Sequence, residues 1–190
     1  MTAEPRVRPE RDGDPVAEVV RAAFADEGDH VAALWAELAA SDLLLGSLVA
    51  EVDGQVVGHV GLSHAWVDAR RELVDVWVLS PLSVVPDRQG AGAGTRLVEA
   101  AVAAARDGGA PLLFLEGDPG YYGPRGFERA DLHGFAPATN RTPAPGFQVV
   151  RFETHEEWMT GQLVYPDIWW RYDAAGLRDP RLAEIEELLR

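Results

Sequence analysis

Three glycines at alternate positions, Gly90, Gly92 and Gly94, separate a β-branched run from an alanine-rich run in VVPDRQGAGAGTRLVEAAVAAA, residues 84 to 105. A strand that enters a helix through glycines leaves the first amide N–H groups of that helix free, and the helix dipole favours negative charge there. Glycine also removes the side chains that would keep a bulky anion away from the backbone. Since this is more glycine than a helix cap needs, the pattern predicts a phosphate-binding loop.

The residues around the loop narrow the choice of phosphate ligand. All 17 basic residues are arginine, so the lysine-bearing loop of nucleotide triphosphatases is excluded. The dinucleotide pattern G-x-G-x-x-G fits poorly, because Thr95 stands where the third glycine is required when counting from Gly90. Glu116, at the end of the next predicted strand, has the place of a ribose-binding acid, which keeps a nicotinamide or flavin cofactor as an alternative.

The stretch Gln89-Gly90-Ala91-Gly92-Ala93-Gly94 resembles the acyl-CoA loop of the GNAT-type N-acetyltransferases, whose signature is Gln or Arg, two residues, Gly, any residue, then Gly or Ala. PLSVVPDRQ, from Pro81, is similar to the fourth strand of that family with its bulge. YYGPRGF, from Tyr121, matches a tyrosine placed four residues before Gly-Phe. GQLVYPDIWW, from Gly161, and the earlier Gly117-Asp118-Pro119 resemble a bacterial branch with Gly-Asp-Pro before paired tyrosines. The resemblance covers roughly residues 45 to 170.

The resemblance implies an acetyl-CoA site. Its pyrophosphate would lie on the amides from Gln89 to Thr95, flanked by Arg88 and Arg96. Its pantetheine arm would pair like an extra strand with the segment Ser83 to Val85, where the fourth and fifth strands splay apart, and the amide of Val84 or Val85 would polarise the thioester carbonyl. The predicted cofactor contacts are Ser83, Val84, Val85, Arg88, Gln89, Gly90, Ala91, Gly92, Ala93, Gly94, Thr95, Arg96 and Tyr122.

The resemblance also implies a general acid at Tyr122, four residues before Gly126-Phe127. A departing CoA thiolate needs a proton or a strong hydrogen bond, and a phenol can supply either, because its ordinary pKa of ~10 lies not far above that of a thiol. Tyr121 is the alternative, since a shift of one residue exchanges the two tyrosines.

A base must accept the proton of the attacking amine, and Glu116, at the end of the fifth strand, is the first candidate. Asp75, His59 and His64 on the preceding strands are alternatives. The chain has no cysteine, which excludes an acyl-cysteine intermediate and favours direct attack in a ternary complex. A second function class, a non-catalytic acyl-CoA sensor or scaffold, would need the glycine loop without the acid and the base.

These residues require a mixed α/β domain in which strands and helices position the loop. Apolar spacing predicts helices in VAEVVRAAF and HVAALWAELAA, the first preceded by an aspartate cap and Pro15. Asp53-Gly54 predicts a hairpin turn. Further strands are expected around Val7, at 72–85 with an interruption at Ser80-Pro81, at 111–117, from Gly126-Phe127 and from Phe147. Helices are expected from Gly94 to about Arg106 and, with a cap, over the last dozen residues. A proline-rich loop is expected over 131–146.

Together these elements predict a GNAT-like α/β fold, with a mixed, mostly antiparallel twisted sheet, splayed central strands and flanking helices. We expect one domain over residues 1–190, with a core at about 5–172 and a helical extension at about 173–190.

Composition limits the partners. The formal net charge of −14 opposes binding to nucleic acid or an anionic membrane. The amino-terminal stretch MTAEPRVRPERDGDP lacks the apolar core of a signal peptide, and no apolar run is long enough for a membrane span. We therefore expect a cytoplasmic bacterial enzyme without a metal, acting on a small amine, an aminoglycoside-like drug or a protein amino group. The 131–147 loop and the aromatic residues Trp158, Tyr165, Trp169 and Trp170 would line the amine pocket, or else form core or a homodimer interface.

Overall fold

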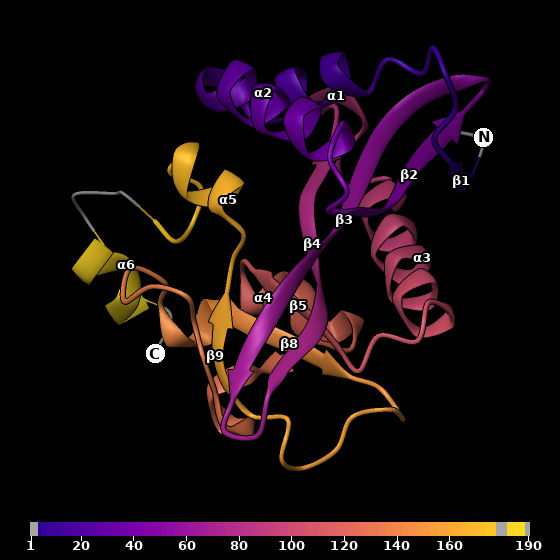
Figure 1. The fold of residues 1–190 in the computed structure, drawn as a ribbon. Helices are drawn as coiled ribbons and strands as arrows, with labels where there is room; N and C mark the ends of the chain where they lie inside the picture. Colours follow the sequence, from indigo (N-terminus) through magenta and orange to yellow (C-terminus); the bar gives the residue numbers. More distant parts are fainter. Residues whose placement is uncertain (1–3, 178–181, 189–190) are drawn as a thin grey trace. The chain divides into compact units, whose positions relative to one another are not determined.

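The computed structural model describes residues 4–177 and 182–188 of the chain. It is a mixed α/β structure whose sheet of nine strands is mostly antiparallel and is flanked by helices (Figure 1), as the sequence predicts. The strands follow the order β1-β2-β3-β4-β5-β8-β6, and β9 pairs with both β3 and β7. By its internal contacts the chain divides into two compact units, which are described one at a time; the single domain stays a prediction.

The first unit runs to Ser63 and resumes over Leu79–Asp107. Asp53 and Gly54 turn the β2–β3 hairpin with φ of 51° and 78°, as the predicted turn requires. The unit contains β1 (Arg6–Pro9), α1 (Val16–Ala23), the 3₁₀ turn Ala25–Glu27, α2 (Gly28–Ala39), β2 (Leu44–Val52), the first part of β3 (Gln55–Ala69), the last part of β4 (Leu73–Val84), the 3₁₀ turn Pro86–Arg88 and α3 (Ala93–Asp107).

Helix α3, which follows the glycine loop, is held to this unit by one apolar stripe. Its residues Leu97, Val98, Ala101 and Ala105 recur at helical spacing and are fully buried, and the helix packs on β1 and β2. This packing fixes the direction of the helix, and therefore the direction of its first-turn amides.

The second unit comprises His64–Val78 and the chain from Gly108 onward. In it β4 pairs in parallel with β5 at Trp77↔Leu113 and Val78↔Phe114. These two parallel strands and α3, which lies between them in the sequence, make a βαβ connection. The unit contains β5 (Leu112–Glu116), α4 (Pro119–Tyr122), the 3₁₀ turn Gly123–Arg125, β6 (Glu128–Arg129), the 3₁₀ turn Ala130–His133, β7 (Phe135–Ala136), the 3₁₀ turn Ala144–Gly146, β8 (Phe147–Arg151), β9 (Gly161–Val164), α5 (Asp167–Arg171) and α6 (Leu182–Leu188).

Strand β5 is the centre of this unit. It lies beside β8 (Figure 1), with which it pairs in antiparallel fashion. In this pairing Glu116 lies opposite Phe147, and the side chains from Leu112 to Leu115 are buried. The ring of Phe114 stacks on that of Phe147 at 5.3 Å. This rigid core ends at Glu116, where the chain turns into the Gly-Asp-Pro segment.

Four local predictions need correction. The Asp14 carboxylate does not cap α1, because it accepts hydrogen bonds from Arg8 and from the Arg11 amide, and Pro15 takes the cap position instead. Strand β4 continues through Ser80-Pro81 without the expected interruption. The strand expected from Gly126-Phe127 begins at Glu128, and the predicted 131–146 loop includes β7, which pairs with β9. The predicted cap of the terminal helix lies outside the described residues.

Candidate functional site

The glycine loop of the first unit has the backbone that an anion site needs. Gly90 and Gly92 have φ of 75° and 90°, in the left-handed region, and no atom lies within 4 Å of where a Cβ on either would stand. The Arg96 amide donates to the Gly92 carbonyl at 3.1 Å, so the amides of Ala93 and Gly94 come before this first helical hydrogen bond of α3. The loop therefore offers open space beside helix-start amides, and it fits the pyrophosphate of a CoA.

The three predicted pantetheine contacts, Ser83 to Val85, lie at the end of β4, and their backbone groups differ in whether β3 already binds them. The Val85 amide donates to the Val57 carbonyl of β3 at 3.0 Å, so it is already engaged. The backbone N–H and C=O groups of successive strand residues point to opposite edges of the strand. The backbone groups of Val84 therefore point away from β3. The Val84 carbonyl accepts a hydrogen bond from the Gln89 side chain at 3.0 Å. Of the two predicted amide donors, the Val84 amide is therefore the one that is not bonded to β3. The side chain of Ser83 is buried.

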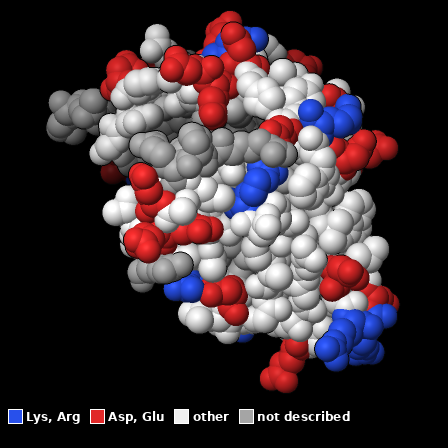
Figure 2. Space-filling model, turned by 90° about the vertical axis from the view of Figure 1, so that its left-hand side faces the viewer, with Lys and Arg blue, Asp and Glu red and all other residues white. Residues whose placement is uncertain are grey.

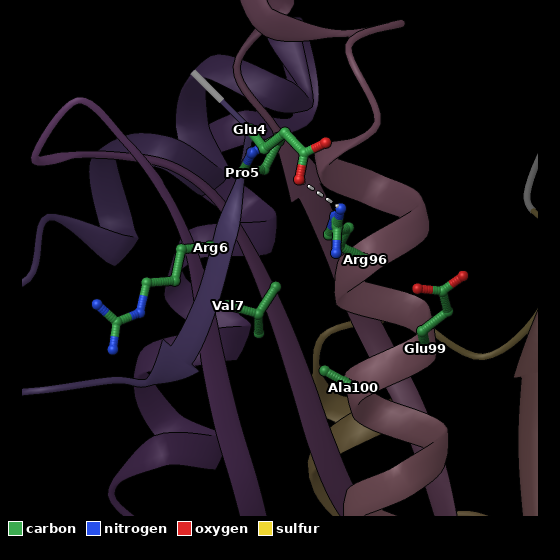
Figure 3. A pocket seen from close by; sticks show the side chains of 7 residues that line it. All are labelled: Glu4, Pro5, Arg6, Val7, Arg96, Glu99 and Ala100. Carbon is green, nitrogen blue, oxygen red and sulfur yellow. Dashed lines mark hydrogen bonds and ion pairs between the residues drawn. The ribbon is translucent and has the colours of Figure 1, made fainter.

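The two arginines that flank the loop have acidic neighbours. Arg88 Nε lies 3.7 Å from Asp87 Oδ2, and together with Ala91 and Ala93 it lines a cavity of about 180 Å³. Arg96 Nη2 pairs with Glu4 Oε2 at 3.0 Å across a groove of about 540 Å³ between β1 and α3 (Figure 3). Glu99 points from the same helix, so Arg96 lies beside two carboxylates in this groove.

In the second unit, the Glu116 carboxylate is held by donors from three other segments. Thr142 Oγ1 donates to Oε2 at 3.0 Å and the Tyr165 hydroxyl donates to Oε1 at 3.1 Å, while the Gly176 amide also bonds the carboxylate. Burial raises the pKa of Glu116, an effect partly offset by these three donors and by the positive charge of Arg141. A carboxyl with a raised pKa and fixed orientation is suited to accept a proton near neutral pH.

The ring of Tyr122 lies against Gly117, the residue that follows Glu116 in the chain. A Cβ on Gly117 would collide with the Tyr122 ring, and Asp118 fixes the start of α4 by accepting a bond from the Gly120 amide at 2.8 Å. Burial, followed by the hydroxyl of Tyr121, raises the pKa of Tyr122 to about 12. The phenol therefore stays protonated and is suited to donate a hydrogen bond.

The alternative tyrosine is packed differently. Arg125 lies over the ring of Tyr121 at 3.7 Å and donates to its carbonyl, and the two tyrosine rings meet edge to face at 4.9 Å. The ring of Tyr122, in contrast, lies against Gly117 and Phe127. The packing brings Tyr122, rather than Tyr121, next to the Glu116 end of β5.

A cavity of about 340 Å³ adjoins Glu116 in this unit. Its wall combines that carboxylate and Thr142 with mainly apolar groups: Gly117, Pro143, Gly146, Leu177 and Ile185, with the exposed Asp118 beside them. The hollow has the size and the mostly apolar wall of a small-molecule site.

The three alternative bases have other surroundings. His59 is fully buried, its Nε2 lies 3.0 Å from Ser47 Oγ, and burial lowers its pKa to about 3, so it is a neutral core residue. His64 Nε2 and Asp75 Oδ1 pair at 2.8 Å across β3 and β4. These two candidates therefore form one pair, with Asp75 largely exposed to solvent.

Sequence reasoning missed the partners of Glu116. The 131–147 loop does line the cavity, through Thr142, Pro143 and Gly146, but Leu177 and Ile185 were not expected. Of the predicted aromatic wall, Tyr165 bonds Glu116, Trp169 is buried against Tyr165, and Trp158 bonds Glu156 instead. No local pattern marks Thr142 or Gly176, because their role depends on contacts distant in the sequence.

The charged side chains of the described residues form neither one large patch on the face shown in Figure 2 nor a group that could hold a metal ion. Figure 2 shows one face on which acidic and basic side chains lie in small separate groups among uncharged ones. Over residues 4–177 and 182–188, no group of three or more His, Asp or Glu side chains is placed to hold a metal ion. Within the same ranges, no helix is both long and apolar enough to cross a membrane.

Known proteins with similar sequences support one family. The family model described as the acetyltransferase (GNAT) family matches residues 14–125, more than half of the chain. The uncharacterised N-acetyltransferase YjhQ of Escherichia coli is 34% identical over 105 residues, which are 55% of this chain. The match spans only 57% of that protein.

Solved structures agree over almost the whole chain. The GNAT family N-acetyltransferase YhbS from Escherichia coli, in complex with CoA, has a TM-score of 0.79 at 27% identity, covering 92% of this chain and 97% of that one. A GNAT family acetyltransferase from Brucella melitensis, in complex with acetyl-CoA, has a TM-score of 0.70 at 30% identity, covering 87% and 98%. The predicted fold is confirmed, while the narrower bacterial branch stays a prediction. This chain belongs to the GNAT family of acetyltransferases.

Proposed function

We propose that the chain transfers an acetyl group from acetyl-CoA to a primary amine by direct attack. The observation that carries the proposal is the open backbone at Gly90 and Gly92, directly before α3, where a side chain would fill the space an anion needs. The CoA and the acetyl-CoA in the Escherichia coli and Brucella melitensis structures support it.

The first unit supplies binding groups in this proposal. The amides from Gly90 to Thr95 hold the pyrophosphate, with Arg88 and Arg96 as counter-charges, whereas the predicted Gln89 amide already donates to the Pro86 carbonyl at 3.3 Å. The Val84 amide polarises the thioester carbonyl, because the Val85 amide is bonded to Val57. Acetyl-CoA, when bound, supplies the activated acetyl group.

The second unit supplies the proton chemistry. Glu116 takes the proton that the amine nitrogen loses as it bonds to the acetyl carbon. The carbon–sulfur bond breaks, and its electron pair leaves with the sulfur. Tyr122 donates a hydrogen bond to this thiolate, which then takes its proton from water. This role suits the pKa of about 12, because full transfer from so weak an acid to a thiolate is unfavourable.

Calorimetric titration with acetyl-CoA, with NADH as the control, tests the binding step. Free-thiol release with a panel of amines then tests transfer. Micromolar acetyl-CoA binding with amine-dependent thiol release is the expected result. Binding without release would support the non-catalytic sensor instead, and a preference for NADH would contradict acetyl-CoA as the ligand. The cytoplasmic location, bacterial source and homodimer stay predictions from the sequence.

A further inference from the structure

The cavity beside Glu116 combines a single well-fixed carboxylate with an apolar wall. Leu177, Pro143 and Ile185 supply apolar surface, and the backbone of Gly146 adds no polar side chain. The volume of about 340 Å³ lies at the small end of the range for small-molecule pockets. This wall offers few partners to a ligand that carries many hydroxyl or amino groups, since each buried polar group without a partner weakens binding.

Among residues 4–177 and 182–188, the donors to the Glu116 carboxylate leave about one of its acceptor positions open. A carboxylate offers about four lone-pair positions, and the donors from Thr142, Tyr165 and Gly176 fill three. The positive charge of Arg141 acts on the same group, and Arg141 Nη2 lies 3.7 Å from Asp173 Oδ1. One further N–H donor at the carboxylate would complete the set.

Two segments of the cavity wall are bonded to each other. The Leu177 amide donates to the Arg141 carbonyl at 3.1 Å, and a Cβ on Gly176 would collide with the Thr139–Thr142 segment. The loop that supplies Thr142 and the segment that supplies Leu177 are therefore bonded to each other. Leu177 and the donor Thr142 therefore keep their positions relative to each other, and both line the cavity at Glu116.

We infer that the cavity at Glu116 binds the acetyl acceptor, and that this acceptor is a small primary amine on an apolar alkyl or aryl body. The amine nitrogen would lie at the open position of Glu116, with its body against Leu177, Pro143 and Ile185. Asp118, exposed beside the cavity, adds negative charge that suits a cationic ligand. This inference rests on the proposed function, since the same Glu116 takes the proton of the amine.

Direct titration of the full chain, without acetyl-CoA, tests the inference independently of transfer. The probes are 2-phenylethylamine and its neutral counterpart 2-phenylethanol. The amine should bind at least about tenfold more tightly than the alcohol, because one carboxylate discriminates between them. Glu116→Gln should abolish that preference, and Leu177→Asn should weaken binding of the amine about tenfold. Leu132→Asn, at a side chain that is 71% exposed and does not line the cavity, should bind as the unmodified chain does.

Equal binding of amine and alcohol, or equal effects of Leu177→Asn and Leu132→Asn, would overturn the inference. Thiol release with 2-phenylethylamine, hexylamine, kanamycin and a lysine-containing peptide gives the second readout. The two apolar amines should have kcat/KM values at least about tenfold above the others. Preference for kanamycin or the peptide would overturn the cavity's role and leave acetyl transfer intact, whereas failure to bind acetyl-CoA in its own titration would contradict the proposed function.

Discussion

The glycine loop of the first unit and the Glu116 cluster of the second are built in opposite ways. The surface of the loop is open because Gly90 and Gly92 have no side chains to cover its backbone. Both glycines lie within six residues of the first turn of α3, so the loop is formed by one short segment. The cluster depends on side chains and amides from four separate segments that meet at one carboxylate. One region is local in the sequence, and the other depends on the tertiary fold.

This difference predicts how each region responds to substitution. A local backbone site fails when a single side chain fills it. A carboxylate held by three donors loses one of them without losing the others, so its properties shift by degrees.

Gly92→Glu should weaken acetyl-CoA binding by at least about 100-fold, because it places a negative side chain where a phosphate is expected and strains a backbone at φ of 90°. Calorimetric titration measures the change. Gly13→Glu is the matched control, since Gly13 has φ of 88° and equally open surroundings. If both variants bind acetyl-CoA equally, the loop does not hold the phosphates.

Tyr122→Phe should lower kcat about 100-fold and leave acetyl-CoA binding unchanged, because only the hydrogen bond to the leaving thiolate is lost. Thiol release under saturating acetyl-CoA measures kcat. Tyr121→Phe should have much less effect, since the Tyr121 ring lies under Arg125. Full turnover by Tyr122→Phe would rule out its assigned role.

Gly117→Ala should lower kcat about tenfold, because the new Cβ displaces the Tyr122 ring from its position beside Glu116. Gly123→Ala is the control on the other side of Tyr122, where no atom lies within 4 Å of the added Cβ. The comparison of kcat between the two variants separates ring displacement from a general effect of alanine. Equal kcat values would show that the position of the ring has no part in the reaction.

Thr142→Val should change kcat at the pH optimum only a few-fold but move the acidic limb of the pH–rate profile to higher pH. The Thr142 hydrogen bond lowers the pKa of Glu116, so its loss raises that pKa, and the basic form then exists only at higher pH. Thr154→Val, which removes a bond to the Ala110 carbonyl instead, serves as the control. An unmoved limb in Thr142→Val would mean that Glu116 is not the titrating base.

The same difference decides what the sequence predicts. The longer strands, α1 to α3 and the glycine loop follow from periodicity and turn chemistry within short windows, and all of them occur in the structure. Glu116 itself is visible at a strand end, but its donors Thr142 and Tyr165 lie 26 and 49 residues further along the chain. Nothing local in a proline-rich loop indicates which hydroxyl meets that carboxylate.

The errors have equally specific causes. Asp14 has the sequence position of a helix cap, but the guanidinium of Arg8 takes its carboxylate in a charge-assisted bond. The two-residue β7 is too short to show a period, so it was expected to be loop. In both cases a tertiary contact outweighed the local pattern.

Calorimetric titrations of three proteins test most directly whether acetyl-CoA binds to the glycine loop and does so without the Tyr122 hydroxyl. The unmodified chain, Tyr122→Phe and Gly92→Glu are titrated with acetyl-CoA in parallel. We expect equal affinity for the first two and a loss of at least about 100-fold for Gly92→Glu. Unchanged affinity in Gly92→Glu would contradict binding of acetyl-CoA at the loop.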